Sequence, residues 1–231
     1  MTEKNLKKYY LNCNKNLLNN IPAELSHVLE FGCSGGVLGK WYKESNPKTI
    51  WHGIDIHKPA VEHAKTLLDK AWCMNANALK PNKVMQDSSY DALIYGDVIE
   101  HLIDPETSVL DHLKLLKSGG KVIVCIPNVQ HWSVMKHVLS GNWTYAEQGI
   151  LDKTHLRFFT RQSFLKLLEK LELNVESMLR ISYENTPNFI KIAPNRVRML
   201  ESLKTLCAEN KLPFNEYDFR TFQYIFIAQK T

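Results

Sequence analysis

Residues 28–39 read VLEFGCSGGVLG and raise the first question about this chain. The apolar run at 28–31 predicts a short buried strand, and a glycine-rich turn follows it directly. The segment GCSGG fits the G-x-S-x-G pattern of a hydrolase nucleophile elbow. It is also a glycine-rich loop of the kind that lies against a nucleotide-like cofactor. Ser34 is therefore either a nucleophile or a small residue in a cofactor loop.

The rest of the chain continues with alternating strands and helices. Apolar runs predict further strands at 50–56, 71–74, 90–95, 121–126, 174–181 and 221–228, and amphipathic or capped stretches predict helices within 1–26 and at 59–70, 106–116, 161–171 and 196–210. Short apolar strands between helices indicate an α/β fold with a seven-stranded, mostly parallel sheet and helices on both faces. The aromatic-rich segment 129–160 breaks this rhythm, and we interpret it as an insertion after the fifth strand.

Composition limits the classes of protein that this chain can belong to. Its 231 residues are 44% hydrophobic and 23% charged, which suits one domain with a packed core. Five scattered cysteines without a C-x-x-C pair favour a reducing compartment over a disulfide framework or a zinc site. No secretory signal or membrane span is visible, so we expect a cytoplasmic protein. The net charge of +5 is dispersed along the chain, which makes nucleic acid an unlikely partner.

The position of the loop favours a cofactor over a nucleophile. A hydrolase elbow normally lies deeper in the sheet and needs an acid and a histidine, and no such pair stands out. Asp55 follows Gly36 by nineteen residues, the spacing at which a carboxylate reaches ribose hydroxyls. A nicotinamide cofactor would require a glycine at Ser34, and Glu30 would repel its pyrophosphate. A carboxylate there suits S-adenosylmethionine, which carries an ammonium and a sulfonium and no phosphate.

Four ordered motifs give a specific resemblance. The stretches VLEFGCSGGVLG, GIDI, YDALIYGDVIEHLIDP and LLKSGGKVIVCIPNV resemble those of class I S-adenosylmethionine-dependent methyltransferases over residues 28–130. The following segment resembles a bacterial glycan-associated branch and, more loosely, methionine-biosynthesis W proteins. Ser34 departs from the glycine that is usual in this family. The resemblance implies a Rossmann-like fold and S-adenosylmethionine as the cofactor.

The resemblance also assigns cofactor-binding roles. It implies that the glycine loop wraps the amino-acid tail above Glu30, that Asp55 accepts from the ribose hydroxyls, and that Ile56 packs on adenine. Asp55 alternatively caps the following helix. The full implied set is Glu30, Gly32, Cys33, Ser34, Gly36, Asp55, Ile56, Asn75, Ala76, Asn77, Gly96, Asp97 and Val98.

Two hypotheses concern removal of a proton from an acceptor hydroxyl. His101 is a candidate general base, because a neutral histidine titrates near working pH; alternatively it is a structural histidine bonded to a loop carbonyl. The spacing of Asp97, Glu100, His101 and His155 looks like the E-x-x-E-H…H metal site of small-RNA 2′-O-methyltransferases, and ubiquinone-biosynthesis O-methyltransferases share its E-H pair. Such a site would hold Mg²⁺ or Mn²⁺. The alternative is that Glu100 and His155 form local hydrogen bonds.

The acceptor is expected to lie under the insertion. Trp132, Trp143, Tyr145 and His155 are candidate substrate residues there, since aromatic faces stack on flat rings, although the aromatic residues are equally explained as packing. We expect an O-methyltransferase that acts on a small-molecule or glycan-linked hydroxyl. The alternatives are a non-catalytic partner protein with this fold and an RNA 2′-O-methyltransferase, and the latter would require a basic channel.

Overall fold

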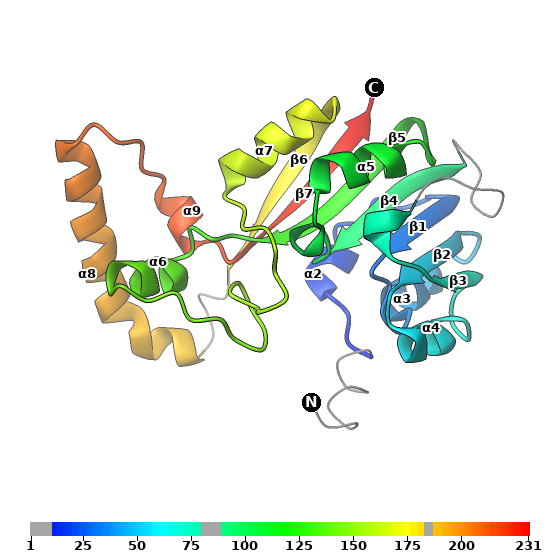
Figure 1. Cartoon of the computed structure of the whole chain (residues 1–231), viewed down its shortest axis with the longest axis horizontal. Coiled ribbons are helices and arrows are strands. Elements are labelled where there is room, and N and C mark those ends of the chain that lie inside the picture. Colours follow the sequence, from blue (N-terminus) through cyan, green and yellow to red (C-terminus); the bar gives the residue numbers. More distant parts are fainter. Residues whose placement is uncertain (1–10, 80–88, 183–186) are drawn as a thin grey trace.

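The computed structural model describes residues 11–79, 89–182 and 187–231 (Figure 1). Its strands are β1 (His27–Phe31), β2 (Ile50–Asp55), β3 (Lys70–Cys73), β4 (Tyr90–Gly96), β5 (Leu116–Pro127), β6 (Leu173–Ile181) and β7 (Gln223–Lys230). Its helices are α2 (Lys15–Leu18), α3 (Val37–Ser45), α4 (Lys58–Ala64), α5 (Pro105–Leu113), α6 (Trp132–Leu139), α7 (Arg161–Lys170), α8 (Pro187–Glu209) and α9 (Glu216–Arg220). Short 3₁₀ turns occur at η1 (Ala76–Ala78) and η2 (Ile99–His101).

The strands form one seven-stranded sheet in the order β3-β2-β1-β4-β5-β7-β6. Strands β1 to β5 pair in parallel, and β7 runs antiparallel to both of its neighbours, β5 and β6. The chain leaves β1 toward one edge of the sheet and leaves β4 toward the other. A crevice therefore opens at the carboxyl ends of β1 and β4, the usual place for a ligand in an open α/β sheet. The predicted fold class is confirmed.

Each face of the sheet packs against its own helices. Alternate residues of a strand point to opposite faces, so Leu29 joins the core beneath α5 and α7, and Val28 joins the core beneath α2, α3 and α4 (Figure 1). Both side chains are fully buried. This double burial explains why the strands are short and largely apolar in sequence.

Several predicted boundaries are wrong. β5 begins at Leu116, five residues before the predicted strand, because Gly119 and Gly120 lie within the strand instead of ending a helix. Gly119 has a φ of +74°, and the pairing of β4 with β5 shifts register at this end, as expected for a bulge. In the N-terminal segment, the helix among the described residues is confined to Lys15–Leu18. Residues 1–10 of the predicted N-terminal helices lie outside the described part.

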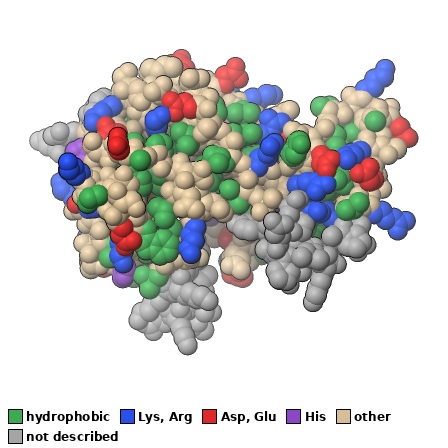
Figure 2. Space-filling model, turned by 180° about the vertical axis from the view of Figure 1, so that it is seen from behind, with side chains coloured by type: hydrophobic (Ala, Val, Ile, Leu, Met, Phe, Trp, Pro, Cys, Tyr) green, Lys and Arg blue, Asp and Glu red, His purple; other side chains and the backbone are tan. Residues whose placement is uncertain are grey.

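The segment 129–160 does leave the sheet, as predicted, but it contains the unpredicted helix α6. Helices α8 and α9 pack on α6 through an apolar cluster centred on Trp132, Leu200 and Phe219, and together they extend beyond the β7–β6 side of the sheet (Figure 1). On the face shown in Figure 2, basic and acidic side chains are interspersed and no continuous basic surface forms among the described residues. Within the same part of the chain, no helix has the length and apolar character needed to cross a bilayer.

Candidate active site

A cleft of about 960 Å³ opens at the carboxyl ends of the central strands. Its wall combines the loops after β1, β2, β3 and β4 with the N-terminal segment 12–17 and with four residues from the second half of the chain. Of the thirteen predicted cofactor residues, twelve line it: Glu30, Gly32, Cys33, Ser34, Asp55, Ile56, Asn75, Ala76, Asn77, Gly96, Asp97 and Val98. The described structure therefore brings nearly the whole predicted set to one place.

Gly36 is the exception, because it does not line the cleft. It is the N-cap residue of α3 with a φ of +80°, and an added Cβ would lie 3.1 Å from the backbone of Ala64. Glycine at this position therefore allows α3 and α4 to pack closely. Gly36 shapes the loop without lining the cleft.

The glycine loop has a left-handed backbone at Gly32 and at Ser34, with φ values of +66° and +50°. A Cβ on Gly32 would lie 2.5 Å from Val98, so this position requires glycine. The Ser34 hydroxyl is buried without a hydrogen-bond partner among the described residues, and none of their histidines is therefore placed to activate it as a nucleophile. Ser34 is a small loop residue, and the hydrolase interpretation is excluded.

Glu30 lies at the end of β1 and is 5% exposed. One carboxylate oxygen accepts a hydrogen bond from the Trp51 indole nitrogen at 2.9 Å. Burial raises the pKa of Glu30 to about 8, an effect that the Trp51 bond partly offsets. A buried carboxyl of this kind favours a cationic ligand, since a nearby positive charge stabilises its ionised form.

Asp55 organises the glycine loop. One oxygen accepts from the backbone N–H of Ser34 at 2.9 Å, and the other accepts from the N–H of His57 at 2.8 Å. The N-cap residue of α4 is His57, so Asp55 is not the helix cap itself. Each carboxylate oxygen keeps a second lone pair, which leaves Asp55 able to accept from a ligand hydroxyl as well.

The loop after β3 is held in shape by its own amides. Asn75 accepts from the backbone N–H of Asn77, and the Asn77 side-chain oxygen accepts from the N–H of Ile103 at 2.7 Å. The buried His112 ring bonds the carbonyl of Ala76 at 2.9 Å. After the neighbouring strand β2, Ile56 is 70% exposed and lines the cleft, as an apolar contact for a flat base requires.

The turn after β4 carries the acid–base candidates. The carboxyl of Asp97 accepts from the side-chain amides of Gln223 at 2.5 Å and Asn14 at 3.5 Å. Burial raises the pKa of Asp97 to about 6. Three residues later, Glu100 is fully buried, and neither of its carboxyl oxygens has a hydrogen-bond partner among the described residues. Burial and the nearby Asp97 raise the pKa of Glu100 well above its usual value.

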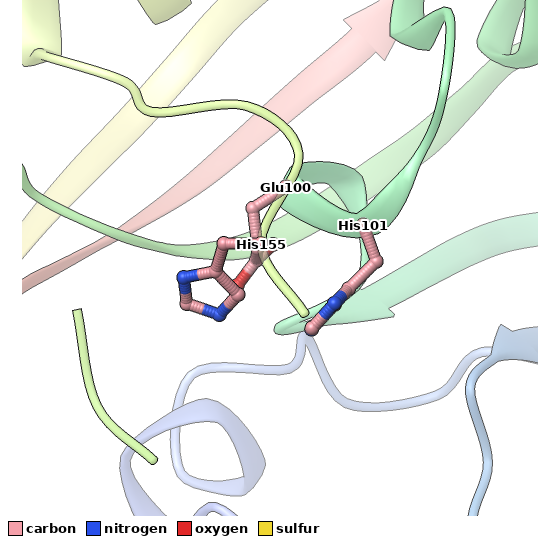
Figure 3. Close-up of side chains that lie close together, drawn as sticks. All are labelled: Glu100, His101 and His155. Carbon is pink, nitrogen blue, oxygen red and sulfur yellow. The ribbon is translucent and has the colours of Figure 1, made fainter. Parts of the chain in front are cut away.

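Glu100, His101 and His155 form a cluster in which one ligand atom from each lies within 4.8 Å of the others (Figure 3). His101 Nδ1 contacts the carbonyl of Thr154 at 3.1 Å, and His155 Nδ1 contacts the carbonyl of Ile150 at 2.9 Å. A carbonyl only accepts, so each Nδ1 is the donor in these bonds, and in a neutral ring with this tautomer Nε2 carries the lone pair. Backbone bonds of this kind orient metal-binding histidines. Asp97 lies outside this group, in contrast to the predicted four-residue set.

The predicted substrate residues separate into two groups. Trp132 is buried against α8 and α9, and this position argues for packing over acceptor contact. Trp143 and Tyr145 are exposed and contact Phe158, with ring centroids 5.1 and 6.3 Å apart, and Phe158 in turn contacts His155. None of the four predicted substrate residues, His155 included, lines the cleft itself.

Sequence reasoning missed several wall residues. The N-terminal segment 12–17, Gln148, Thr154, Phe222 and Gln223 all line the cleft. Segment 12–17, Phe222 and Gln223 carry no motif, whereas Gln148 and Thr154 belong to the segment 129–160 that is predicted to cover the acceptor. Folding alone brings them to the carboxyl edge of the sheet.

Comparison with known proteins agrees with this geometry. A family model described as "Methyltransferase domain" matches residues 6–178, so the chain belongs to that family. It is 22% identical over 170 residues to a ubiquinone biosynthesis O-methyltransferase of a Shewanella species, covering 72% of this chain and 71% of that protein. Among solved structures, it resembles a chain in the complex between the Haloferax volcanii Trm112 methyltransferase activator and a methyltransferase. The TM-score is 0.63 at 14% identity, and the match covers 98% of this chain and 92% of that chain.

A second solved structure, a SAM-dependent methyltransferase from Archaeoglobus fulgidus, gives a TM-score of 0.58 and 18% identity, with coverage of 98% of this chain and 92% of that one. The chain is thus an S-adenosylmethionine-dependent methyltransferase. The relatives do not support placement in a glycan-associated branch.

The cleft residues fit S-adenosylmethionine. Glu30 supplies a buried carboxyl for a cation, Asp55 supplies lone pairs for hydroxyls, and Ile56 supplies an exposed apolar face. Among the described residues of the wall, Lys15 is the single lysine or arginine, so the cleft has few groups to neutralise a pyrophosphate. This donor and acceptor set suits a cofactor that is cationic at one end and free of phosphate.

Proposed function

We propose that this methyltransferase methylates a hydroxyl oxygen of a small molecule, with His101 at the reacting end of the cleft. The observation that carries the proposal is the position of His101. It lines the cleft just after β4, with Nδ1 bonded to a loop carbonyl and Nε2 free to accept a proton. When bound, S-adenosylmethionine supplies an electrophilic methyl group. The neutral imidazole then takes the hydroxyl proton as the oxygen becomes a nucleophile.

The relatives support oxygen as the methylated atom. The Shewanella protein and other curated relatives are named ubiquinone biosynthesis O-methyltransferases. The acceptor of the present chain stays a prediction. A sugar or glycan-linked hydroxyl is the expectation from the sequence, and the names of the relatives favour testing phenolic hydroxyls beside it.

As an alternative at the same site, we propose that Glu100, His101 and His155 hold a divalent ion, Mg²⁺ or Mn²⁺. The Nε2 lone pair of His101 then binds the ion, and His101 does not act as the base. The two Glu100 oxygens have no hydrogen bond among the described residues, and one of them lies 3.9 Å from His155 Nε2. With the Nε2 atoms of the two histidines they form a suitable donor set, and the backbone bonds to both Nδ1 atoms support it. Such an ion would lower the pKa of the acceptor hydroxyl. Asp97 is left out of the set because its carboxyl already accepts from two amides.

The acceptor is tested by supplying methyl-labelled cofactor with phenols, sugars and nucleotide sugars, with and without Mn²⁺. With an active acceptor, His101→Ala should keep its affinity for S-adenosylhomocysteine and lose about 10²–10⁴-fold in turnover. Full turnover in His101→Ala would contradict its role both as base and as metal ligand.

The first test of the metal is a measurement of stability and needs no acceptor. Mn²⁺ should raise the unfolding temperature of the wild type, EDTA should reverse the rise, and His155→Ala should abolish it. The alternative, in which His101 acts alone, predicts no response to Mn²⁺. If Mn²⁺ has no effect on the wild type and His155→Ala turns over normally in EDTA, the metal proposal fails and the His101 proposal stands.

A further inference from the structure

The turn at Asp97 connects the cofactor side of the cleft to the Glu100–His101 turn. Gly96, Asp97 and Val98 line the cleft, and η2 begins directly afterwards at Ile99. Asp97 has a φ of +57°, a left-handed conformation that is unfavourable for most residues other than glycine. Surrounding contacts must therefore hold this residue in place.

Two side chains from opposite ends of the chain hold the Asp97 carboxyl. Gln223, the first residue of β7, donates its amide to one oxygen at 2.5 Å. Asn14, in the N-terminal segment, faces the other oxygen at 3.5 Å. Both oxygens of the Asp97 carboxyl therefore face amide donors. Asp97 is not part of the cluster formed by Glu100, His101 and His155.

The orientation of the Asn14 amide follows from its neighbours. Its side-chain oxygen accepts from the N–H of Leu17 at 3.1 Å and so caps α2. The amide nitrogen must then point the other way, toward Asp97 and the sulfur of Cys125 at 3.4 Å. Leu17 is itself buried, and a Cβ on Gly96 would lie 2.9 Å from it. Two contacts thus join the N-terminal segment to the β4 turn: the Asn14 amide with Asp97, and Leu17 with Gly96. The cap of α2 fixes the orientation of the Asn14 amide.

We propose that Asp97 is a latch for the cofactor site, with Asn14 and Gln223 as positioning residues. The latch holds residues 12–17 as a wall of the cleft and keeps the β4 turn in its left-handed conformation. This role replaces that of a metal ligand for Asp97. It depends on the cofactor of the family and not on the proposed acceptor, metal or base.

The chemistry of the latch permits a test by exchange of partners. In Asp97→Asn, the charged acceptor is lost, and the Gln223 amide must turn its oxygen toward the new NH₂ group, because the Asn14 oxygen is already held by Leu17. In Gln223→Glu, two carboxylates face each other. The double variant restores a donor and an acceptor at every contact, because the amide introduced at position 97 donates to the carboxylate introduced at position 223 and still accepts from Asn14.

The first readout is the affinity for S-adenosylhomocysteine, measured by calorimetry at pH 8. Each single variant should bind about tenfold more weakly or worse, the cost of one lost bond to a charged group. The double variant should return to within about threefold of the wild type. Asn14→Ser, which keeps a helix cap and removes the amide, should also weaken binding. Gln229→Glu, the same change on the same strand and outside the cleft wall, should bind like the wild type.

The second readout is hydrogen exchange of residues 12–18 without ligand. Exchange should be faster in both single variants and should return toward the wild-type rate in the double variant. The latch proposal would be overturned if the losses of S-adenosylhomocysteine affinity in the two single variants added in the double variant. It would also be overturned if both single variants had wild-type affinity and wild-type hydrogen exchange. If Asp97→Asn fails to fold, Gln223→Glu and Asn14→Ser carry the same test. A wild type without affinity for S-adenosylhomocysteine would contradict cofactor use, while the exchange data still judge the latch.

Discussion

At the scale of single residues, the cleft contains carboxyl groups with three different surroundings. Glu30 is buried with one indole donor, Asp55 accepts from two backbone N–H groups, and Asp97 accepts from two side-chain amides. Backbone donors favour ionisation, and burial opposes it. The same functional group is thereby suited to bind a cation, to organise a loop, or to join two segments.

The first prediction concerns Glu30 and pH. At pH 6 a carboxyl with a pKa of about 8 is mostly protonated, so pairing with an ammonium must release a proton. The affinity for S-adenosylhomocysteine should therefore rise from pH 6, by at most tenfold per pH unit, and level off near pH 8. Calorimetry at pH 6.5 in buffers of different ionisation enthalpy should detect release of nearly one proton.

Glu30→Gln provides the control. It should bind more weakly at pH 8 and lose the pH dependence. Without ligand, the wild type should lose stability relative to Glu30→Gln as pH rises from 4.5 to 8, because the folded state holds the proton more tightly than the unfolded state. A wild-type affinity that is constant from pH 6 to 8 would argue against contact between Glu30 and the ammonium.

The second prediction concerns Asp55. Asp55→Ala should weaken S-adenosylhomocysteine binding by about 1.5–3 kcal/mol, the range for a lost charge-assisted hydrogen bond. An analogue that lacks the ribose 2′-hydroxyl separates loop order from direct contact. The wild type should discriminate against this analogue, and Asp55→Ala should not. Equal discrimination by both proteins would assign Asp55 to loop order alone.

At the scale of elements, the loop after α6 positions the histidine cluster. Asp152 accepts from the Thr154 backbone N–H at 2.8 Å and from its hydroxyl at 2.7 Å, and the Thr154 carbonyl in turn accepts from His101. Further along, the N–H groups of Leu156 and Arg157 both donate to the Glu100 carbonyl. The loop is thus closed onto η2 from both sides of His155.

The third prediction tests this loop. Asp152→Ala should leave S-adenosylhomocysteine affinity unchanged, because Asp152 does not line the cleft. It should reduce the Mn²⁺-dependent rise in unfolding temperature and lower turnover about tenfold, because His101 loses its fixed orientation. Asp152→Asn keeps one acceptor oxygen and should retain most of both properties. Weaker cofactor binding by Asp152→Ala, with normal turnover at saturation, would contradict this separation.

At the scale of the whole molecule, the cleft is assembled from distant parts of the chain. Its wall includes Asn12 near one end and Gln223 near the other, with the strand ends between them. A ligand that contacts all of these parts binds the folded state and not the unfolded chain. Cofactor binding and global stability are therefore linked.

The fourth prediction follows from this linkage. S-adenosylhomocysteine at 100 times its dissociation constant should stabilise the protein by about 2.7 kcal/mol. For a domain of this size, that corresponds to a rise in unfolding temperature of about 5–10 °C in a thermal melt. Adenosine alone, which lacks the ammonium that Glu30 would pair with, should give a smaller rise at the same concentration. An unfolding temperature that does not change with S-adenosylhomocysteine would contradict the assignment of the cleft.

The sequence by itself determined the parts whose signals are local. Apolar strand runs and the glycine loop predict the sheet and most of its helices. The resemblance of four motifs implies the cofactor residues, and nearly all of these line one cleft because parallel strands bring their carboxyl ends to one edge. The spacing around Glu100 and His101 also pointed to His155 before the structure placed them together. Local signals define the ends of helices and strands less well. The pair Gly119 and Gly120 is typical of a helix end, yet both residues lie inside β5.

Tertiary structure alone decided which distant groups meet. No motif marks Asn14 or Gln223, and their convergence on Asp97 depends on β7 inserting between β5 and β6 and on Leu17 entering the core. Trp132 has an aromatic ring that could stack on a substrate, yet it is buried against α8 and α9. The hydrophobic pattern of the sequence does not show which helices will pack together. Side chains far apart in the chain acquire their partners from the shape of the folded molecule, and that shape directs Asp97 toward two amides and buries Trp132 among helices.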